Sequence, residues 1–142
     1  MTTLRSTAVW TGGLGFTATE GGQSLQLDAS PALGVCPSGL LLTALVGCTG
    51  IDVVRTLGKM RVPIEGFEVS ADGDLAETHP QRYTAARLCY AFTGPADLDS
   101  DRIRRAVYLS SEKYCGVLAT LRAALPVDIR IEINGVACPL WA

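Results

Sequence analysis

The chain has 142 residues with a net charge of −2, and 48% of its residues are hydrophobic. This length and composition predict one folded domain over residues 1–142 with a real core, and they exclude wholesale disorder. The 12 basic residues against 14 acidic ones leave no basic footprint of a nucleic-acid-binding protein. We therefore expect no nucleic-acid partner.

The chain contains five cysteines, an odd number that cannot all pair within one chain. Residues 1–20 hold no continuous apolar stretch, so no secretory signal is visible and we expect a cytoplasmic protein in a reducing compartment. The thiols are then buried small hydrophobes, metal ligands or reactive groups.

The N-terminal segment is rich in threonine and glycine, and glycine pairs interrupt it at hairpin intervals. This pattern predicts short antiparallel strands near residues 4–10, 14–19 and 23–28. Residues 28–37 hold two prolines and a glycine and predict a loop.

A long helix is predicted over Ser38–Lys59, apolar on nearly all sides. Such a helix is either a buried central helix or a membrane span. Asp52 and Arg55 lie inside it, and each is costly at the centre of a bilayer. The charges favour the buried helix, so we expect no membrane partner.

The second half of the chain predicts further strands and helices. In chain order they are a half-buried strand 67–71, a polar turn-like segment 72–80, strand 83–92, helix 98–110 capped by Asp97 or Asp99, helix 116–125, strand 127–133 and a turn at Asn134–Gly135. The sum is an α+β fold, a mainly antiparallel sheet packed on a long buried central helix. The remaining apolar side of that helix needs other helices or a second subunit, which predicts a homodimer.

Cys48 lies in the middle of the long helix, between Gly47 and Gly50. Either the glycines are helix-packing contacts and the cysteine is filler, or their missing side chains let a small substrate approach the sulfur. A reactive Cys48 needs a cation to favour its thiolate, and Arg55 lies seven residues on, nearly on the same face. Asp52, one turn away, either disfavours a second negative charge or pairs with Arg55.

Cys115 lies at the start of the last predicted helix. The positive end of that helix favours a thiolate, whereas Glu112 opposes it. Ser110 and Ser111 are plausible caps at the break between the two helices.

The other three cysteines have no predicted setting that activates a sulfur. Cys36 and Cys138 each precede a proline in loop-like segments, and Cys89 falls in a strand. The chain has no Cys-x-x-Cys motif and a single histidine, His79, which is best interpreted as a turn or surface residue. We therefore expect no metal site and no bound cofactor.

Three sequence blocks resemble the OsmC/Ohr family of osmotically inducible and organic hydroperoxide resistance proteins. The blocks are LLLTALVGCTGIDVV in the long helix, ETHPQRY at 77–83 and AVYLSSEKYC at 106–115, and they are typical of the YhfA-like branch. The resemblance covers about residues 8–134, and it includes two cysteines in matching contexts, Cys48 and Cys115.

The resemblance implies an intertwined homodimer of OsmC-like fold with two active sites near the subunit interface. It also implies a thiol-dependent peroxidase for hydroperoxides, in which Cys48 matches the peroxidatic and Cys115 the resolving cysteine. Cys48 would become a sulfenic acid, Cys115 would condense with it to a disulfide, and an external dithiol would reduce that disulfide. Apolar surroundings favour organic hydroperoxides as substrates.

Two positions depart from the family pattern. Gly39 stands where active members carry a glutamate, and Leu14 stands where they carry an arginine. Without that activating pair, Arg55, or Arg5 or Arg82 from a second subunit, would have to serve the thiolate. The departures leave an alternative open, a catalytically weak homologue that senses redox state or binds a small molecule.

Overall fold

The computed structural model describes residues 1–140 of the chain. Their contacts divide the chain into two compact units, residues 1–41 and residues 42–142. The long helix α1 (Pro37–Met60) begins in the first unit and continues through the second. Each unit is described by itself below.

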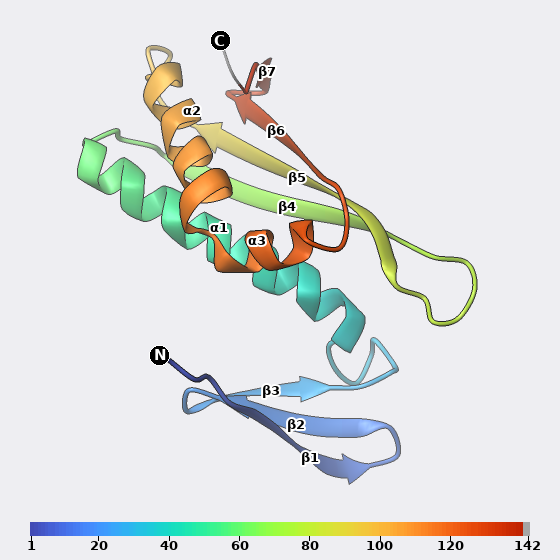
Figure 1. The fold of residues 1–142 in the computed structure, drawn as a ribbon. Helices are drawn as coiled ribbons and strands as arrows, with labels where there is room; N and C mark the ends of the chain where they lie inside the picture. The colour runs from blue at the N-terminus through green and yellow to red at the C-terminus, as the bar shows by residue number, and fades with distance from the viewer. Residues whose placement is uncertain (141–142) are drawn as a thin grey trace. The chain divides into compact units, whose positions relative to one another are not determined.

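The first unit is a three-stranded antiparallel sheet in the order β1–β2–β3 (Figure 1). Its strands are β1 (Ser6–Gly12), β2 (Gly15–Glu20) and β3 (Gln23–Leu27). The glycine pairs at 12–13 and 21–22 have positive φ angles and form the two hairpin turns. The three predicted strands are confirmed.

The second unit has a four-stranded sheet in the order β4–β5–β6–β7. The strands are β4 (Gly66–Leu75), β5 (Tyr83–Thr93), β6 (Val127–Ile133) and β7 (Val136–Cys138). Two neighbouring pairs are antiparallel, whereas β5 and β6 are parallel. Parallel pairing follows from the helices that connect these two strands, because a crossover returns the chain in the same direction.

Helices α2 (Ser100–Leu109) and α3 (Gly116–Arg122) lie in that crossover, joined by a π-helical turn η1 (Ser110–Tyr114). Figure 1 shows α1 and α2 on the same face of the sheet. The side chain of Asp99 accepts a hydrogen bond from the Arg102 N–H at 3.1 Å, so Asp99 is the N-cap of α2. The predicted α+β fold is confirmed.

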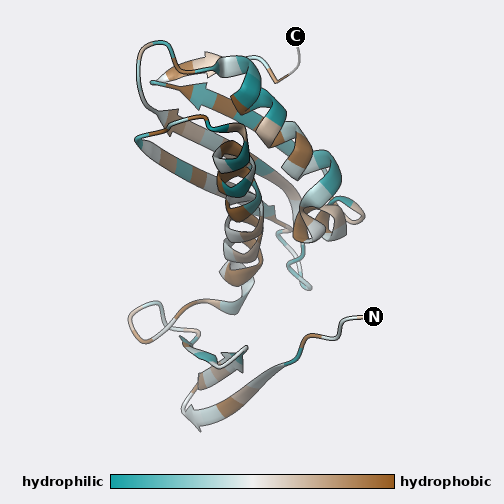
Figure 2. Cartoon of the chain, turned by 90° about the vertical axis from the view of Figure 1, so that its left-hand side faces the viewer, coloured by the Kyte–Doolittle hydropathy of each residue, from teal (hydrophilic) through white to brown (hydrophobic). Residues whose placement is uncertain are grey.

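The core of the second unit lies between the sheet and the helices. Every second residue of β5 is buried in this core, as Leu88, Tyr90 and Phe92 show. Phe67 of β4 stacks on Phe92 with ring centroids 4.5 Å apart. From α1, a single stripe is buried, made of Leu45, Thr49, Val53 and Leu57. Figure 2 shows brown bands along α1, and some of these apolar side chains, such as Ile51 and Val54, are exposed in the single chain.

Three local predictions are wrong in detail. Residues 72–75, predicted as a turn, continue β4, because Asp72 pairs in register with Arg87 and Asp74 forms a two-armed ion pair with the same arginine. Cys138 ends β7 and is not in a loop, since the Asn134–Gly135 turn, with both φ angles positive, brings it back beside Ile131. The last helix ends at Arg122.

By length and composition alone, α1 could cross a membrane, with a mean hydropathy of 1.6 in its most apolar window. In the structure its buried stripe packs in a protein core, and Asp52 accepts a hydrogen bond from the Ser110 hydroxyl inside that packing. These contacts are those of a core helix.

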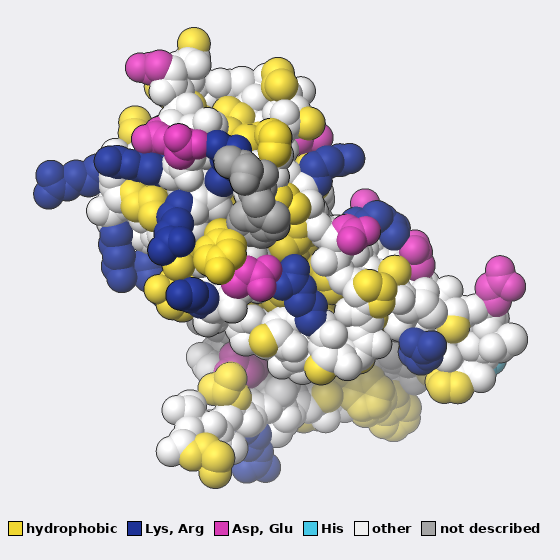
Figure 3. Space-filling view, turned by 45° about the horizontal axis from the view of Figure 1, so that its top comes forward, with side chains coloured by type: hydrophobic (Ala, Val, Ile, Leu, Met, Phe, Trp, Pro, Cys, Tyr) yellow, Lys and Arg dark blue, Asp and Glu magenta, His cyan; other side chains and the backbone are white. Residues whose placement is uncertain are grey.

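The surface carries charges of both signs side by side. Arg102 pairs with Asp99, Arg104 with Asp101 and Arg122 with Glu112. In the space-filling view, basic and acidic side chains are interspersed over the face shown (Figure 3). The face of α2 that carries Arg102 and Arg104 is therefore lined with ion pairs.

Candidate active site

Cys48 lies at the middle of α1, on the turn between the buried residues Leu45 and Thr49. Its own side chain is partly buried and packs against the core. Asp52 lies four residues further on, so its carboxylate projects from the same side of the helix one turn away. The sequence prediction of a Cys48–Asp52 neighbourhood is confirmed.

Cys115 is held where the chain changes direction after the π-helical turn. Its backbone is extended (φ −77°, ψ 100°), and its N–H donates to the Ser110 carbonyl at 2.8 Å. Its sulfur accepts a hydrogen bond from the Leu118 N–H at 3.4 Å, which makes Cys115 the N-cap of α3. The side chain is only 4% exposed. The break between the helices thus ends at Cys115. Of the two serines predicted as caps, Ser110 is the C-cap of α2, whereas the N-cap of α3 is Cys115.

The fold brings the two cysteines together although they lie far apart in the sequence. The sulfurs of Cys48 and Cys115 and a carboxylate oxygen of Asp52 all lie within 4.8 Å of one another. Disulfide formation needs a sulfur–sulfur distance of about 2.05 Å, so the bond would require only a short approach of the two side chains. The arrangement can support a reversible dithiol–disulfide change.

Burial raises the pKa of the Cys115 thiol to about 11. The Leu118 N–H lowers this pKa, whereas Cys48 and the negative charge of Asp52 raise it further. The expectation that the helix end favours a Cys115 thiolate is therefore wrong in direction, because desolvation outweighs the amide hydrogen bond.

This raised pKa predicts a loss of stability at high pH. The folded state keeps the Cys115 proton up to about pH 11, while the unfolded thiol, with an ordinary pKa of 9.0, loses it earlier. Since the native state then binds more protons, the free energy of unfolding should fall by about 2 kcal/mol as pH rises from about 9 to about 11. Urea unfolding at several pH values measures this loss.

The matched control is Cys115→Ser, because serine does not titrate in this range. The free energy of unfolding of this variant should fall little below about pH 10. Above that pH, Tyr90 contributes a loss in the same direction, because burial raises its pKa to about 12. An equal loss in both chains below pH 10 would assign the effect to another group.

A chain of buried hydroxyl groups leads to this site. The Thr49 hydroxyl lies 2.7 Å from the Tyr90 hydroxyl and 2.7 Å from that of Ser110. The Ser110 hydroxyl in turn donates to the Asp52 carboxylate at 3.1 Å. An ionised carboxylate only accepts, so protons along this chain point from Tyr90 toward Asp52. The network therefore holds the Asp52 side chain in its position beside both sulfurs.

The sequence alone does not predict this network. Its one available signal was the presence of Thr49 and Asp52 in an otherwise apolar helix segment. The partners Tyr90 and Ser110 lie 41 and 61 residues from Thr49 in sequence, and no local pattern connects them.

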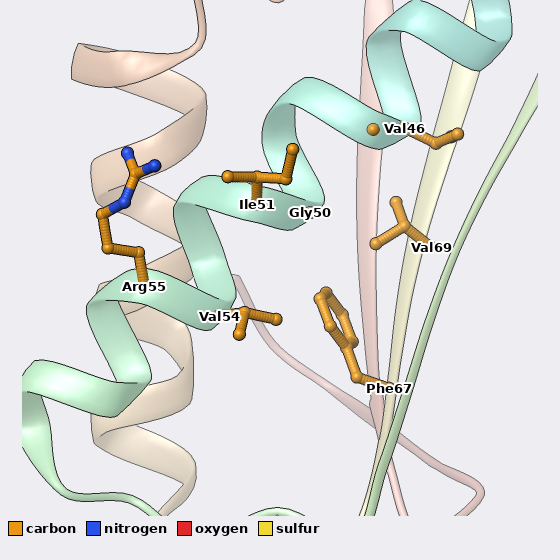
Figure 4. A pocket seen from close by; sticks show the side chains of 8 residues that line it. Val46, Gly50, Ile51, Val54, Arg55, Phe67 and Val69 are labelled. Atoms are coloured by element: carbon orange, nitrogen blue, oxygen red, sulfur yellow. The ribbon is translucent and has the colours of Figure 1, made fainter. Parts of the chain in front are cut away.

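An open apolar groove of about 530 Å³ borders the turn of α1 that carries Cys48. Figure 4 shows Phe67 and Val69 pointing from β4 toward α1, with Val46, Ile51 and Val54 on the helix side. Gly47 and Gly50 also line the groove. A Cβ at Gly47 would meet nothing within 4 Å, so Gly47 is not a packing contact within this chain, whereas a Cβ at Gly50 would lie 3.5 Å from Val69.

Arg55 lines this groove and also a second hollow of about 580 Å³ beside Asp52. Within residues 1–140 the ion pairs do not include one between Arg55 and Asp52, whose carboxylate accepts from Ser110. The alternative of an Asp52–Arg55 ion pair is therefore not found among the described residues, and Arg55 lines the groove together with Gly47 and Gly50.

The other residues considered for activation lie in exposed places. Arg5 precedes β1, and Arg82 precedes β5 and donates to the Tyr83 carbonyl at 3.3 Å. Leu14 is 70% exposed in the β1–β2 turn. Gly39 lies in the first turn of α1 with open space at its Cβ position, nine residues and roughly 13 Å along the axis from Cys48. A single continuous helix therefore keeps the Gly39 position away from the sulfur of its own chain.

The three remaining cysteines differ from one another. The prediction that Cys36 has no activating setting is wrong, because hydrogen bonds from the Gly39 and Ser38 backbone lower the pKa of this exposed thiol. Cys89 pairs in register with Arg130 in the β5–β6 ladder, where the two side chains interact. Cys138 is partly buried at the end of β7, and His79 is exposed in the β4–β5 loop.

A long central helix on a mixed four-stranded sheet, with two cysteines meeting at its middle, defines an α+β dithiol protein. The sequence model of the family described as OsmC-like protein matches residues 29–130. The chain therefore belongs to the OsmC-like family. Protein YhfA of Escherichia coli (strain K12) is 33% identical over 132 residues, which cover 92% of this chain and 98% of YhfA.

Solved structures share the fold. A hypothetical protein from Aquifex aeolicus VF5 superimposes with a TM-score of 0.86 at 25% identity, over 94% of this chain and 98% of that one. The organic hydroperoxide resistance protein OsmC from Legionella pneumophila superimposes with a TM-score of 0.68 at 15% identity, over 93% of this chain and 98% of that one. The predicted OsmC-like fold and family are confirmed.

Proposed function

We propose that this protein is a thiol-dependent peroxidase that reduces organic hydroperoxides in oxidative-stress defence. The observation that carries the proposal is the meeting of the Cys48 and Cys115 sulfurs within 4.8 Å at the middle of α1. Two thiols at this separation can form and release a disulfide without unfolding the chain.

The reaction proceeds in three balanced steps. The Cys48 thiolate attacks the peroxide O–O bond, forming an S–O bond, and the departing alkoxide takes up a proton and leaves as an alcohol. The Cys115 sulfur then displaces hydroxide from the Cys48 sulfenic acid, which forms the disulfide and releases water once the Cys115 proton is transferred. An external dithiol reduces the disulfide by exchange and is itself oxidised. The chemistry needs no bound cofactor.

An apolar groove supports an organic substrate. It lies on the side of α1 that carries Gly47 and Gly50, the glycines that flank Cys48, and Cys48 itself does not line it. Val46, Val54 and Phe67 offer it hydrocarbon surface, and the missing side chain of Gly47 leaves room for close approach. A hydroperoxide with an alkyl or aryl group gains from this contact, whereas hydrogen peroxide does not. The Legionella pneumophila protein that shares this fold is named an organic hydroperoxide resistance protein, which agrees with this class of substrate.

One observation favours a second candidate, a weak homologue that senses redox state or binds a small molecule. Asp52 places a negative charge within 4.8 Å of both sulfurs, which disfavours a thiolate. Gly39 and Leu14 also replace the activating pair that the family resemblance implies. In the peroxidase proposal, Arg55, which borders both hollows beside this turn, supplies the opposing positive charge.

Treating the reduced protein with cumene hydroperoxide and mapping disulfides by mass spectrometry tests the proposal. A Cys48–Cys115 bridge that forms within seconds at stoichiometric peroxide supports the peroxidase. A bridge that needs minutes or a large excess supports the second candidate. No change in either thiol contradicts both.

The active form is proposed to be a homodimer in the reducing cytoplasm, in which a second copy of this chain closes over the apolar groove of α1, so that the substrate binds at the interface between the two copies. Ile51 and Val54 are 59% and 51% exposed on that face, and Val9 and Trp10 of β1 are 67% and 64% exposed. Side chains of this size are usually buried, so two copies that cover each other's apolar faces would account for them.

Val54→Glu is expected to shift the protein from dimer to monomer, because a carboxylate placed in an apolar interface loses its water shell without a partner. Sedimentation equilibrium measures the shift, and the wild-type protein should sediment at twice the 15.0 kDa mass of one chain. The control Glu68→Gln changes an exposed charge on β4 and should leave the dimer intact. A wild-type protein that sediments as a 15.0 kDa monomer at micromolar concentration would contradict the proposed dimer.

A further inference from the structure

We propose that the reduced cysteine pair binds a Zn²⁺ ion through the sulfurs of Cys48 and Cys115 and one carboxylate oxygen of Asp52. The three ligand atoms lie within 4.8 Å of one another and come from two separate segments of the fold. Two thiolates and a carboxylate are donors that Zn²⁺ prefers over Mg²⁺ or Ca²⁺, which take oxygen ligands. This binding is separate from hydroperoxide reduction and does not depend on it.

The geometry is close to that of a zinc site. Zn–S bonds of about 2.3 Å in a tetrahedral arrangement hold two sulfurs about 3.8 Å apart. The two sulfurs lie at most 4.8 Å apart, so the distance between them must shorten by no more than about 1 Å to bind Zn²⁺. Cys48 and Asp52 are four residues apart on one side of α1, a spacing that lets two helix residues share an ion. Cys115 approaches from the α3 N-cap.

Other groups orient two of the ligands before any ion arrives. The Ser110 hydroxyl holds the Asp52 carboxylate at 3.1 Å, and the Thr49 hydroxyl holds Ser110 at 2.7 Å. The Leu118 N–H lies 3.4 Å from the Cys115 sulfur and hydrogen-bonds to it. Such contacts behind the ligands keep them in place and typically govern metal affinity.

Of the three ligand residues, Asp52 borders a hollow in the surface. Asp52 lines the hollow of about 580 Å³ that it shares with Arg55, Lys59 and Tyr114. Two thiolates, one carboxylate and Zn²⁺ give a net charge of −1, which Arg55 and Lys59 at that hollow offset. Three protein ligands would leave the fourth position of a tetrahedral Zn²⁺ for a water molecule, as in an open zinc site.

Zinc binding would block the redox chemistry reversibly. An ion that occupies the lone pairs of both sulfurs leaves neither free to attack a peroxide or to join a disulfide. Zinc and oxidation would then compete for the same two thiols.

Isothermal titration of the reduced protein with Zn²⁺, under a phosphine reductant and without peroxide, tests this inference. The background chain is Cys36→Ser, because the exposed Cys36 thiol is a separate metal-reactive group. We expect one Zn²⁺ per chain, and replacement of Zn²⁺ by Co²⁺ should give a thiolate-to-cobalt charge-transfer band. In this background Cys48→Ser and Cys115→Ser should each abolish the band, and Asp52→Asn should weaken Zn²⁺ binding about tenfold or more.

Cys89→Ser is the matched control and should bind Zn²⁺ as the background chain does. Alkylation of the unsubstituted protein, followed by peptide mass spectrometry, gives a readout that does not depend on the folding of any variant. Zinc should slow alkylation of Cys48 and Cys115 and leave Cys89 unchanged. The proposal is overturned if no Zn²⁺ binds at micromolar concentration, if Asp52→Asn binds as tightly as the background chain, or if Cys48 and Cys115 are not protected. Since no peroxide is present, these outcomes are independent of whether the protein is a peroxidase.

Discussion

Replacing Cys48 by serine is expected to reduce hydroperoxide consumption to the uncatalysed background and to abolish the Cys48–Cys115 disulfide. Serine is close to cysteine in size and keeps the packing of α1, but hydroperoxides do not oxidise its hydroxyl as they oxidise a thiolate to a sulfenic acid. Cys115 does not substitute for Cys48, because its thiol is buried with its pKa raised to about 11. The measurement is the rate of cumene hydroperoxide loss in the presence of excess dithiol.

Cys115→Ser should behave differently and so separates the two roles. Without external dithiol, which would itself reduce a sulfenic acid, this variant should consume one equivalent of hydroperoxide and stop with a sulfenic acid on Cys48, which dimedone labels for mass spectrometry. Cys36→Ser is the control, since the lowered pKa of that exposed thiol makes it the competing nucleophile. Turnover that survives Cys48→Ser, or that disappears in Cys36→Ser, would move the peroxidatic role away from Cys48.

The parts of the fold that the sequence predicts well are those set by local periodicity. The helix expected over residues 38–59 is observed over Pro37–Met60, and the strand at 127–133 has the expected bounds. Both have long, regular apolar patterns, whereas β4 extends past its apolar alternation to Leu75. Its last residues are held by the Asp74–Arg87 ion pair on the neighbouring strand, a contact that no local pattern announces.

The parts of the site that escape prediction depend on contacts between distant segments. The resemblance points to Cys48 and Cys115 as a pair, but the direction of the Cys115 pKa depends on how deeply its sulfur is buried. A sequence reports the helix end beside Cys115 and not the desolvation that outweighs it. The same holds for Ser110. Serine is a residue type typical of helix caps, and no local pattern shows that the Ser110 hydroxyl donates a hydrogen bond to Asp52 of α1.

Thr49→Val is expected to lower the free energy of unfolding by about 1–3 kcal/mol. Valine has nearly the shape of threonine, so the loss comes from the hydroxyl and not from packing. The Tyr90 hydroxyl, in a residue that is 0% exposed, would keep no partner, and a buried polar group without a partner is costly. Urea unfolding measures the change.

A double-mutant cycle with Tyr90→Phe distinguishes this mechanism from a general weakening of α1. Tyr90→Phe alone should cost about 1 kcal/mol, because Thr49 keeps its bond to Ser110. The double variant leaves no orphaned Tyr90 hydroxyl, so its loss should be smaller than the sum of the two single losses. Thr120→Val, which removes an exposed hydroxyl of α3, should change stability by less than about 0.5 kcal/mol. Additive losses at Thr49 and Tyr90 would mean that the two hydroxyls are not coupled, and that an orphaned Tyr90 hydroxyl is not the cause of the loss in Thr49→Val.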